Sequence, residues 1–102
     1  MSRYGSDKPD QGTREIVQRL RSVGARVEYI GKPLDLLVGF QRRFSMLEIK
    51  RKGAKPRNDQ MKQQELIRDM KDEGLPVYVV HDFDEAFDAI LTTSRRRNLA
   101  EQ

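Results

Sequence analysis

The sequence predicts a small α/β domain in which helices flank a mixed four-stranded sheet, in the order α-β-β-β-α-β-α. A chain of 102 residues has room for one domain with one modest core. Apolar residues recur at helical spacing in three segments, and four short β-rich runs lie between those segments. The last run follows a helix, so we expect it to pair in parallel with an earlier strand through a right-handed crossover.

We expect residues 12–91 to form the domain, between a flexible arm at 1–11 and a basic tail at 92–102. The arm lacks the apolar stretch of a signal peptide, and no run approaches the roughly 20 apolar residues of a membrane span. We therefore expect no membrane partner. The chain has no cysteine and one histidine, which excludes disulfides, thiolate metal sites and His-rich zinc sites. This composition favours an intracellular, cytoplasmic protein.

The first helix is expected to run from about Thr13 to Gly24. Ile16 and Leu20 lie on its apolar stripe, and a glycine is a common residue just after a helix end. Asp10 or Thr13 would cap its first turn.

Three β-like runs follow the first helix. Residues 25–30 alternate apolar and polar side chains, which predicts a strand with one solvent-facing side. Residues 34–40 are more continuously apolar, which predicts a strand buried on both faces. After a turn, residues 44–51 form the third strand, and its period of two places Glu48 and Lys50 on one face.

A second helix is expected from residue 58 or 59 to residue 73, closed by Gly74. Gln63, Ile67 and Met70 share its inward side at helical spacing. A glutamine aligned with the core needs a polar partner near the sheet. Gln60 lies on the same side, so either glutamine could fill that role.

The last strand is expected at residues 75–81, and an Asp-x-x-Glu capping box then starts the last helix. The box consists of Asp82 and Glu85. His81, between the strand and the box, is interpreted as structural.

Positive charge is concentrated in residues 41–58, which carry a net +6, whereas residues 59–91 carry −6. Such a focused field suits a polyanionic partner. The alternative is an ordinary solvated hairpin and loop. The residues we assign to nucleic-acid binding are Arg42, Arg43, Arg51, Lys52, Lys55 and Arg57.

Two carboxylates and an ammonium are expected at one edge of the sheet. Asp35 lies in an apolar run, where an uncompensated carboxylate is costly, and Glu48 follows it thirteen residues later. Mg²⁺ or Mn²⁺ takes oxygen ligands of this kind, and the Ile49 main-chain oxygen could add another. Lys50 could orient a water or offset phosphate charge. The alternative is that Glu48 and Lys50 form only a solvated cross-strand ion pair.

The motif Pro33-Leu34-Asp35, the triplet 48–50 and the order of elements together resemble the PD-(D/E)xK nuclease superfamily. Within it, the chain is most similar to stand-alone VRR-NUC domains, across residues 13–90. The resemblance implies a restriction-endonuclease-like fold and a Mg²⁺- or Mn²⁺-dependent DNA endonuclease, with branched, flap or junction DNA as substrate. It also implies roles for Glu15 near the metal and for Gln63 in the second helix.

A chain of 102 residues offers little area for binding a DNA duplex, which favours a homodimer, and the resemblance implies the same arrangement. Phe40, Phe44 or the last helix could supply the contact. Two other functions stay open at this point. One is a nucleic-acid-binding module without catalysis, and the other is a protein-interaction domain with an acidic partner.

Overall fold

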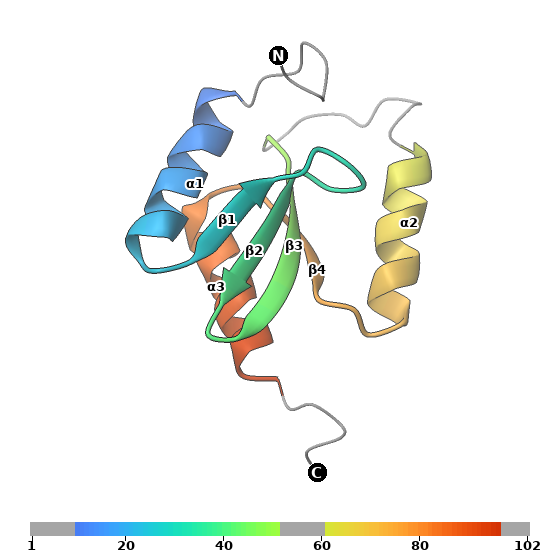
Figure 1. The fold of residues 1–102 in the computed structure, drawn as a ribbon. Helices are drawn as coiled ribbons and strands as arrows, with labels where there is room; N and C mark the ends of the chain where they lie inside the picture. Colours follow the sequence, from blue (N-terminus) through green and yellow to red (C-terminus); the bar gives the residue numbers. More distant parts are fainter. Residues whose placement is uncertain (1–9, 52–60, 97–102) are drawn as a thin grey trace.

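The computed structural model describes residues 10–51 and 61–96 and confirms the expected order of elements (Figure 1). The first half of the chain forms helix α1 and three strands: α1 at Gln11–Ser22, β1 at Arg26–Tyr29, β2 at Leu36–Phe40 and β3 at Arg43–Ile49. The second half adds two helices around one strand: α2 at Met61–Asp72, β4 at Val77–Val80 and α3 at Phe83–Ser94.

The four strands form one mixed sheet in the order β1-β2-β3-β4. The neighbours β1, β2 and β3 pair antiparallel, with Leu36 opposite Leu47 in the β2–β3 pair. Strand β4 pairs in parallel with β3, and Ile49 lies opposite Val80. The predicted crossover through α2 is therefore confirmed.

Helices α1 and α3 cover one face of the sheet, and α2 stands on the other face beside β4 (Figure 1). The main core lies under α1 and α3, where Leu20, Leu36 and Leu47 are fully buried. A smaller cluster joins α2 to the sheet through Leu34, Ile67 and Val77.

Helix α1 begins earlier than expected because Asp10 is its cap. The Asp10 Oδ1 atom accepts a hydrogen bond from the Thr13 backbone N–H at 2.7 Å, which places Gln11 inside the helix. The same bond lowers the pKa of the Asp10 carboxyl. Helix α1 therefore includes one residue assigned to the arm, and α3 extends three residues into the segment assigned to the tail.

Glycines end both α1 and α2, as predicted. Gly24 has a φ of 95° and Gly74 a φ of 82°, in the left-handed region that follows many helices.

The expectation that residues 34–40 are buried on both faces is wrong. Leu36 and Val38 are fully buried, whereas Leu37, Gly39 and Phe40 are partly exposed. Leu37 and Gly39 face the α2 side of the sheet, where α2 packs chiefly on β4, so no described helix covers the part of that face formed by β1 and β2.

Asp82 caps α3, as the expected capping box requires. Its Oδ1 accepts from the Glu85 N–H at 2.9 Å, and Glu85 Oε1 accepts from the backbone N–H of His81 at 2.9 Å. In the described residues, every helix is too short or too polar to cross a membrane.

Candidate active site

The candidate site lies at the edge of the sheet where β2 begins and where β3 and β4 end, called here the site edge (top of the sheet in Figure 1). Continuing the register of Leu36 and Leu47 by one step brings Asp35 opposite Glu48. Residues opposite each other in an antiparallel pair lie on the same face of the sheet. The predicted carboxylate pair therefore forms.

Asp35 is fixed by the strands around it. Its Oδ2 atom accepts a hydrogen bond from the Ile49 backbone N–H at 2.8 Å. Its main-chain oxygen accepts from the N–H of Ile30 at 2.9 Å, and the preceding Leu34 is fully buried. Because the Asp35 side chain takes the Ile49 N–H, β2 starts at Leu36 and is shorter than the sequence predicted.

Glu48 is a buried carboxylate with an incomplete set of partners. The residue is 5% exposed, and nothing in residues 10–51 or 61–96 donates a hydrogen bond to its Oε1 atom. The pKa of the Glu48 carboxyl is raised to about 7, and burial is the largest cause. The Asp35 charge also raises this pKa, and the Lys50 ammonium lowers it.

Lys50 shares the face of Glu48, as the period of two predicted. Its Nζ atom lies 3.3 Å from Glu48 Oε2, and its backbone N–H donates to the Val80 oxygen at 2.9 Å. The Glu48 and Lys50 side chains are only 7% and 23% exposed. The ion pair of Glu48 and Lys50 is therefore largely buried, and the alternative that it lies on a solvated face is wrong.

A divalent cation fits the donor atoms at this edge. It would offset the charge of two adjacent carboxylates, and Glu48 Oε1, which has no hydrogen-bond partner among the described residues, would become one of its ligands. The Ile49 carbonyl points to the same side of its strand as its N–H, toward Asp35. No group of three or more His or acidic side chains that could hold a metal occurs in the part of the chain that the structure describes. Two carboxylates suffice for Mg²⁺, which usually keeps several waters.

Gln63 supports the site from α2. Its Nε2 atom donates to the Pro33 main-chain oxygen at 2.9 Å, so it holds the loop that leads into Asp35. The role predicted for it at the metal stays a prediction. Gln60, the other candidate, lies outside the described residues.

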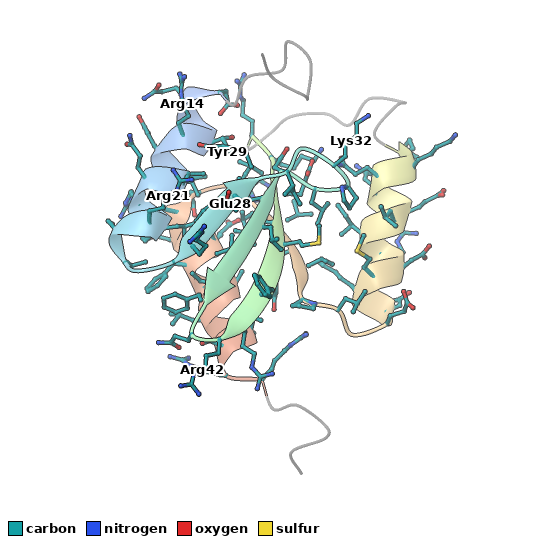
Figure 2. All side chains as sticks on the ribbon, viewed as in Figure 1. Arg14, Arg21, Glu28, Tyr29, Lys32 and Arg42 are labelled. Atoms are coloured by element: carbon teal, nitrogen blue, oxygen red, sulfur yellow. The ribbon has the colours of Figure 1, made fainter. Side chains whose placement is uncertain are left out.

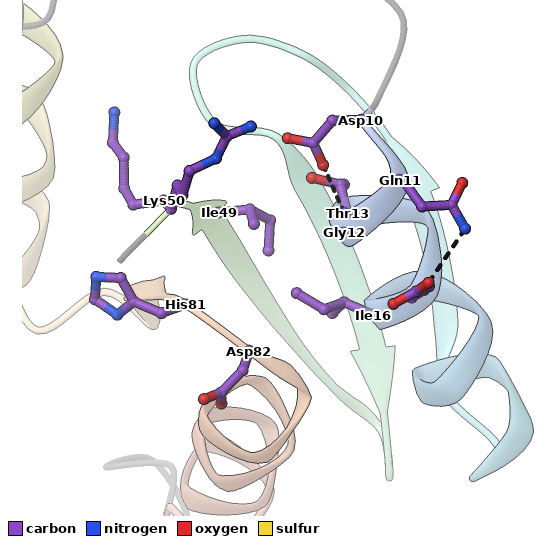
Figure 3. A pocket seen from close by; sticks show the side chains of 11 residues that line it. Asp10, Gln11, Gly12, Thr13, Ile16, Ile49, Lys50, His81 and Asp82 are labelled. Atoms are coloured by element: carbon purple, nitrogen blue, oxygen red, sulfur yellow. Dashed lines mark hydrogen bonds between the residues drawn. The ribbon is translucent and has the colours of Figure 1, made fainter. Parts of the chain in front are cut away.

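Glu15 lies on the α1 side of the site edge. It accepts a hydrogen bond from Gln11 Nε2 at 3.2 Å, and it lines a hollow of about 470 Å³ together with Ile49 and Lys50 (Figure 3). Asp35 and Glu48 do not line this hollow. The structure thus brings Asp35, Glu48 and Lys50 together and leaves Glu15 outside that group, so its metal role stays a prediction.

His81 also lines the hollow, although the sequence was interpreted as giving it a structural role only (Figure 3). One step beyond the pair of Ile49 and Val80, the register brings His81 beside Lys50. Its Nδ1 atom lies 2.8 Å from Glu85 Oε1, and its bonds lower the pKa of Glu85. The parallel register is the sequence signal that would have placed it here.

The residues assigned to nucleic-acid binding divide between the two ends of the sheet. Arg42, in the β2–β3 turn, lies at the opposite end from Lys32, which precedes β2 (Figure 2). Arg43 begins β3 near Arg42, and Arg51 follows β3 at the site edge. The remaining three lie outside the described residues: Lys52, Lys55 and Arg57.

Comparisons with protein-family models, curated protein sequences and solved structures found no match to this chain.

Proposed function

We propose that this protein is a divalent-metal-dependent DNA endonuclease that hydrolyses phosphodiester bonds in branched, flap or junction DNA. The observation that carries the proposal is the pair of half-buried Asp35 and buried Glu48 beside the Lys50 ammonium. A structural ion pair needs one carboxylate, whereas here a second acid raises the pKa of the first, and Glu48 Oε1 has no hydrogen-bond partner among the described residues. Such an arrangement is costly without a bound cation.

The residues at the site edge divide the chemistry among them. Asp35, Glu48 and the Ile49 carbonyl would hold Mg²⁺ or Mn²⁺. When bound, the ion supplies Lewis acidity toward the phosphate and lowers the pKa of a water. Lys50 orients the attacking water or offsets the charge that develops on the phosphate.

The distribution of charge supports a nucleic-acid substrate. Residues 41–58, which include Glu48 and Lys50, carry a net +6 against a total of +4 for the chain. The N-termini of α1 and α3 lie at the same edge and add partial positive charge, partly offset by their capping acids Asp10 and Asp82. Among the described residues, Lys50, Arg51 and these two helix ends supply the positive charge at the site edge, whereas Arg42 and Arg43 lie at the other end of the sheet.

We further propose that the active form is a homodimer. Specific protein–DNA interfaces bury about 1,000 Å² or more of protein surface, which is a large demand on a chain of 102 residues. Phe40, one of the predicted contacts, is partly exposed and packs against Phe87 at 6.1 Å between ring centroids; its role in a dimer stays a prediction.

The proposal is tested with labelled linear, flap and four-way DNA in Mg²⁺ or Mn²⁺. We expect cleavage by the wild type and at least about a hundredfold loss in Lys50→Ala, because one positioned charge at a reacting phosphate is lost. Lys71→Ala, which changes an exposed lysine in the last turn of α2, serves as control. DNA binding without cleavage would instead support a binding module. No binding at low salt would support the protein-interaction alternative.

A further inference from the structure

No helix in residues 10–51 or 61–96 covers one half of a sheet face, and this half leads to the site edge. This open face consists of β1, β2 and the first half of β3 on the side that faces α2 but is not covered by it (Figure 1). Phe44 lies on it and is 65% exposed, the highest value of any large apolar side chain in the described residues. By the period of two, Phe44 shares its face with Met46 and Glu48.

One edge of the Phe44 ring lies over Gly39. In the sheet register, Arg26, Gly39 and Phe44 form one row across β1, β2 and β3. A Cβ atom at Gly39 would lie 3.4 Å from Phe44 Cε1 and 3.7 Å from Cδ1. The ring therefore lies where a side chain at position 39 would otherwise be. Covering Gly39 accounts for the position of this one edge, but most of the ring remains exposed to solvent.

We propose that an unpaired nucleotide of the DNA strand lies on the open face with its base stacked on Phe44, which rests on the nuclease function proposed above. Aromatic side chains on sheet faces stack bases of single strands without sequence preference. Phe44 lies four residues before Glu48, or about 13 Å along the strand. That distance corresponds to about four stacked nucleotides at 3.4 Å each.

The charges along this path fit a strand of nucleic acid better than a second protein chain. Arg42 lies in the turn next to Phe44, and Lys50 and Arg51 lie at the other end of β3, so a polyanion meets cations at both ends. Beside the ring, Arg26 and Glu28 form an exposed ion pair at 3.1 Å. A single exposed ring among charged side chains is a small apolar surface for a protein interface, whose core is depleted of charge.

The Phe44→Trp variant tests the contact directly, because the chain has no tryptophan of its own. Its fluorescence is titrated with a 12-nucleotide single strand and with a 12-base-pair duplex, in Ca²⁺ to limit cleavage. We expect strong quenching by the single strand and little by the duplex. Leu75→Trp, at an exposed apolar position between α2 and β4, is the matched control and should change with neither.

Affinity measurements complete the test. Phe44→Ala should weaken single-strand binding about tenfold, within the range reported for one stacked base, and leave duplex binding within about twofold. Phe44→Tyr should restore the affinity, and Leu75→Ala should match wild type. Equal losses for both DNA forms, or no loss, would overturn the proposal. So would a dimer that dissociates in Phe44→Ala while single-strand affinity stays unchanged, since a second copy would then occupy the face.

The experiments distinguish failure of the stacking proposal from failure of the nuclease proposal. If the wild type stacks a base on position 44 but cleaves nothing in Mg²⁺ or Mn²⁺, the nuclease proposal fails alone. If it cleaves and Phe44→Ala binds both DNA forms as wild type does, the stacking proposal fails alone.

Discussion

At the scale of single residues, the environment of Glu48 sets the expected behaviour of the site. Its pKa in the folded state, about 7, is above its ordinary value of 4.5, and burial is the largest cause. Between these two values the folded protein binds more protons than the unfolded chain. The free energy of unfolding therefore falls as the pH rises from about 4.5 through about 7.

Glu48→Gln should remove this pH dependence. In metal-free buffer, we expect the wild type to lose stability between pH 5 and pH 8, by at most on the order of 3 kcal/mol for a shift of this size. The variant should lose less and should be at least as stable as wild type at pH 8, because it lacks the buried charge of Glu48. Urea unfolding at several pH values measures this. Parallel curves for the two proteins would show that Glu48 titrates normally.

Binding of a divalent metal ion should offset the repulsion between the Asp35 and Glu48 carboxylates and so stabilise the folded protein. A ligand at a hundred times its Kd adds about 2.7 kcal/mol to the free energy of unfolding. We therefore expect Mn²⁺ to raise the melting temperature of the wild type and to leave that of Asp35→Asn unchanged. Glu28→Gln, which changes an exposed carboxylate on β1, should respond as wild type does. An equal rise in all three would place the bound ion elsewhere.

At the scale of secondary structure elements, the sequence predicted the strands and helices because their patterns are local. The period of two placed Glu48 and Lys50 on one face, and left-handed glycines ended α1 and α2. Two features depended on packing between distant segments and were missed. The open face arises because α2 stands over β4, and His81 reaches the site edge only through the parallel register of β3 and β4.

Helix α2 should influence catalysis through Gln63. Gln63→Ala removes the hydrogen bond to the Pro33 oxygen, worth about 1 kcal/mol, and loosens the loop that precedes Asp35. We expect about a tenfold lower cleavage rate, because small displacements of a positioned group are costly. Gln64→Ala makes the same chemical change one residue away and should be near wild type. Single-turnover rates compare the two, and equal rates would remove Gln63 from the site.

At the scale of the whole molecule, the charge is modest but unevenly placed, and this should control DNA affinity. The net charge is +4, with +6 concentrated in residues 41–58. Affinity should fall linearly on a plot of log K against log salt, with a slope of about −0.9 for each phosphate contacted in a duplex.

Arg42→Gln and Arg51→Gln should each lower the steepness of that slope by about 0.9, because each removes one phosphate contact. The two arginines lie at opposite ends of β3, so together they test whether DNA follows the length of the hairpin. Lys71→Gln should leave it unchanged. Fluorescence anisotropy at four or more salt concentrations measures the slopes. A slope that none of the three variants alters would show that the DNA does not follow the hairpin.

We propose above that Asp35 and Glu48 hold the divalent ion with which the protein cleaves DNA, and one matched pair of variants tests this most directly. Glu48→Gln and Glu28→Gln make the same change on the same face of the sheet, at a buried and an exposed carboxylate. In single-turnover cleavage of flap DNA with Mn²⁺, we expect wild-type rates from Glu28→Gln and at least about a hundredfold loss from Glu48→Gln. Equal rates in both variants would contradict the claim.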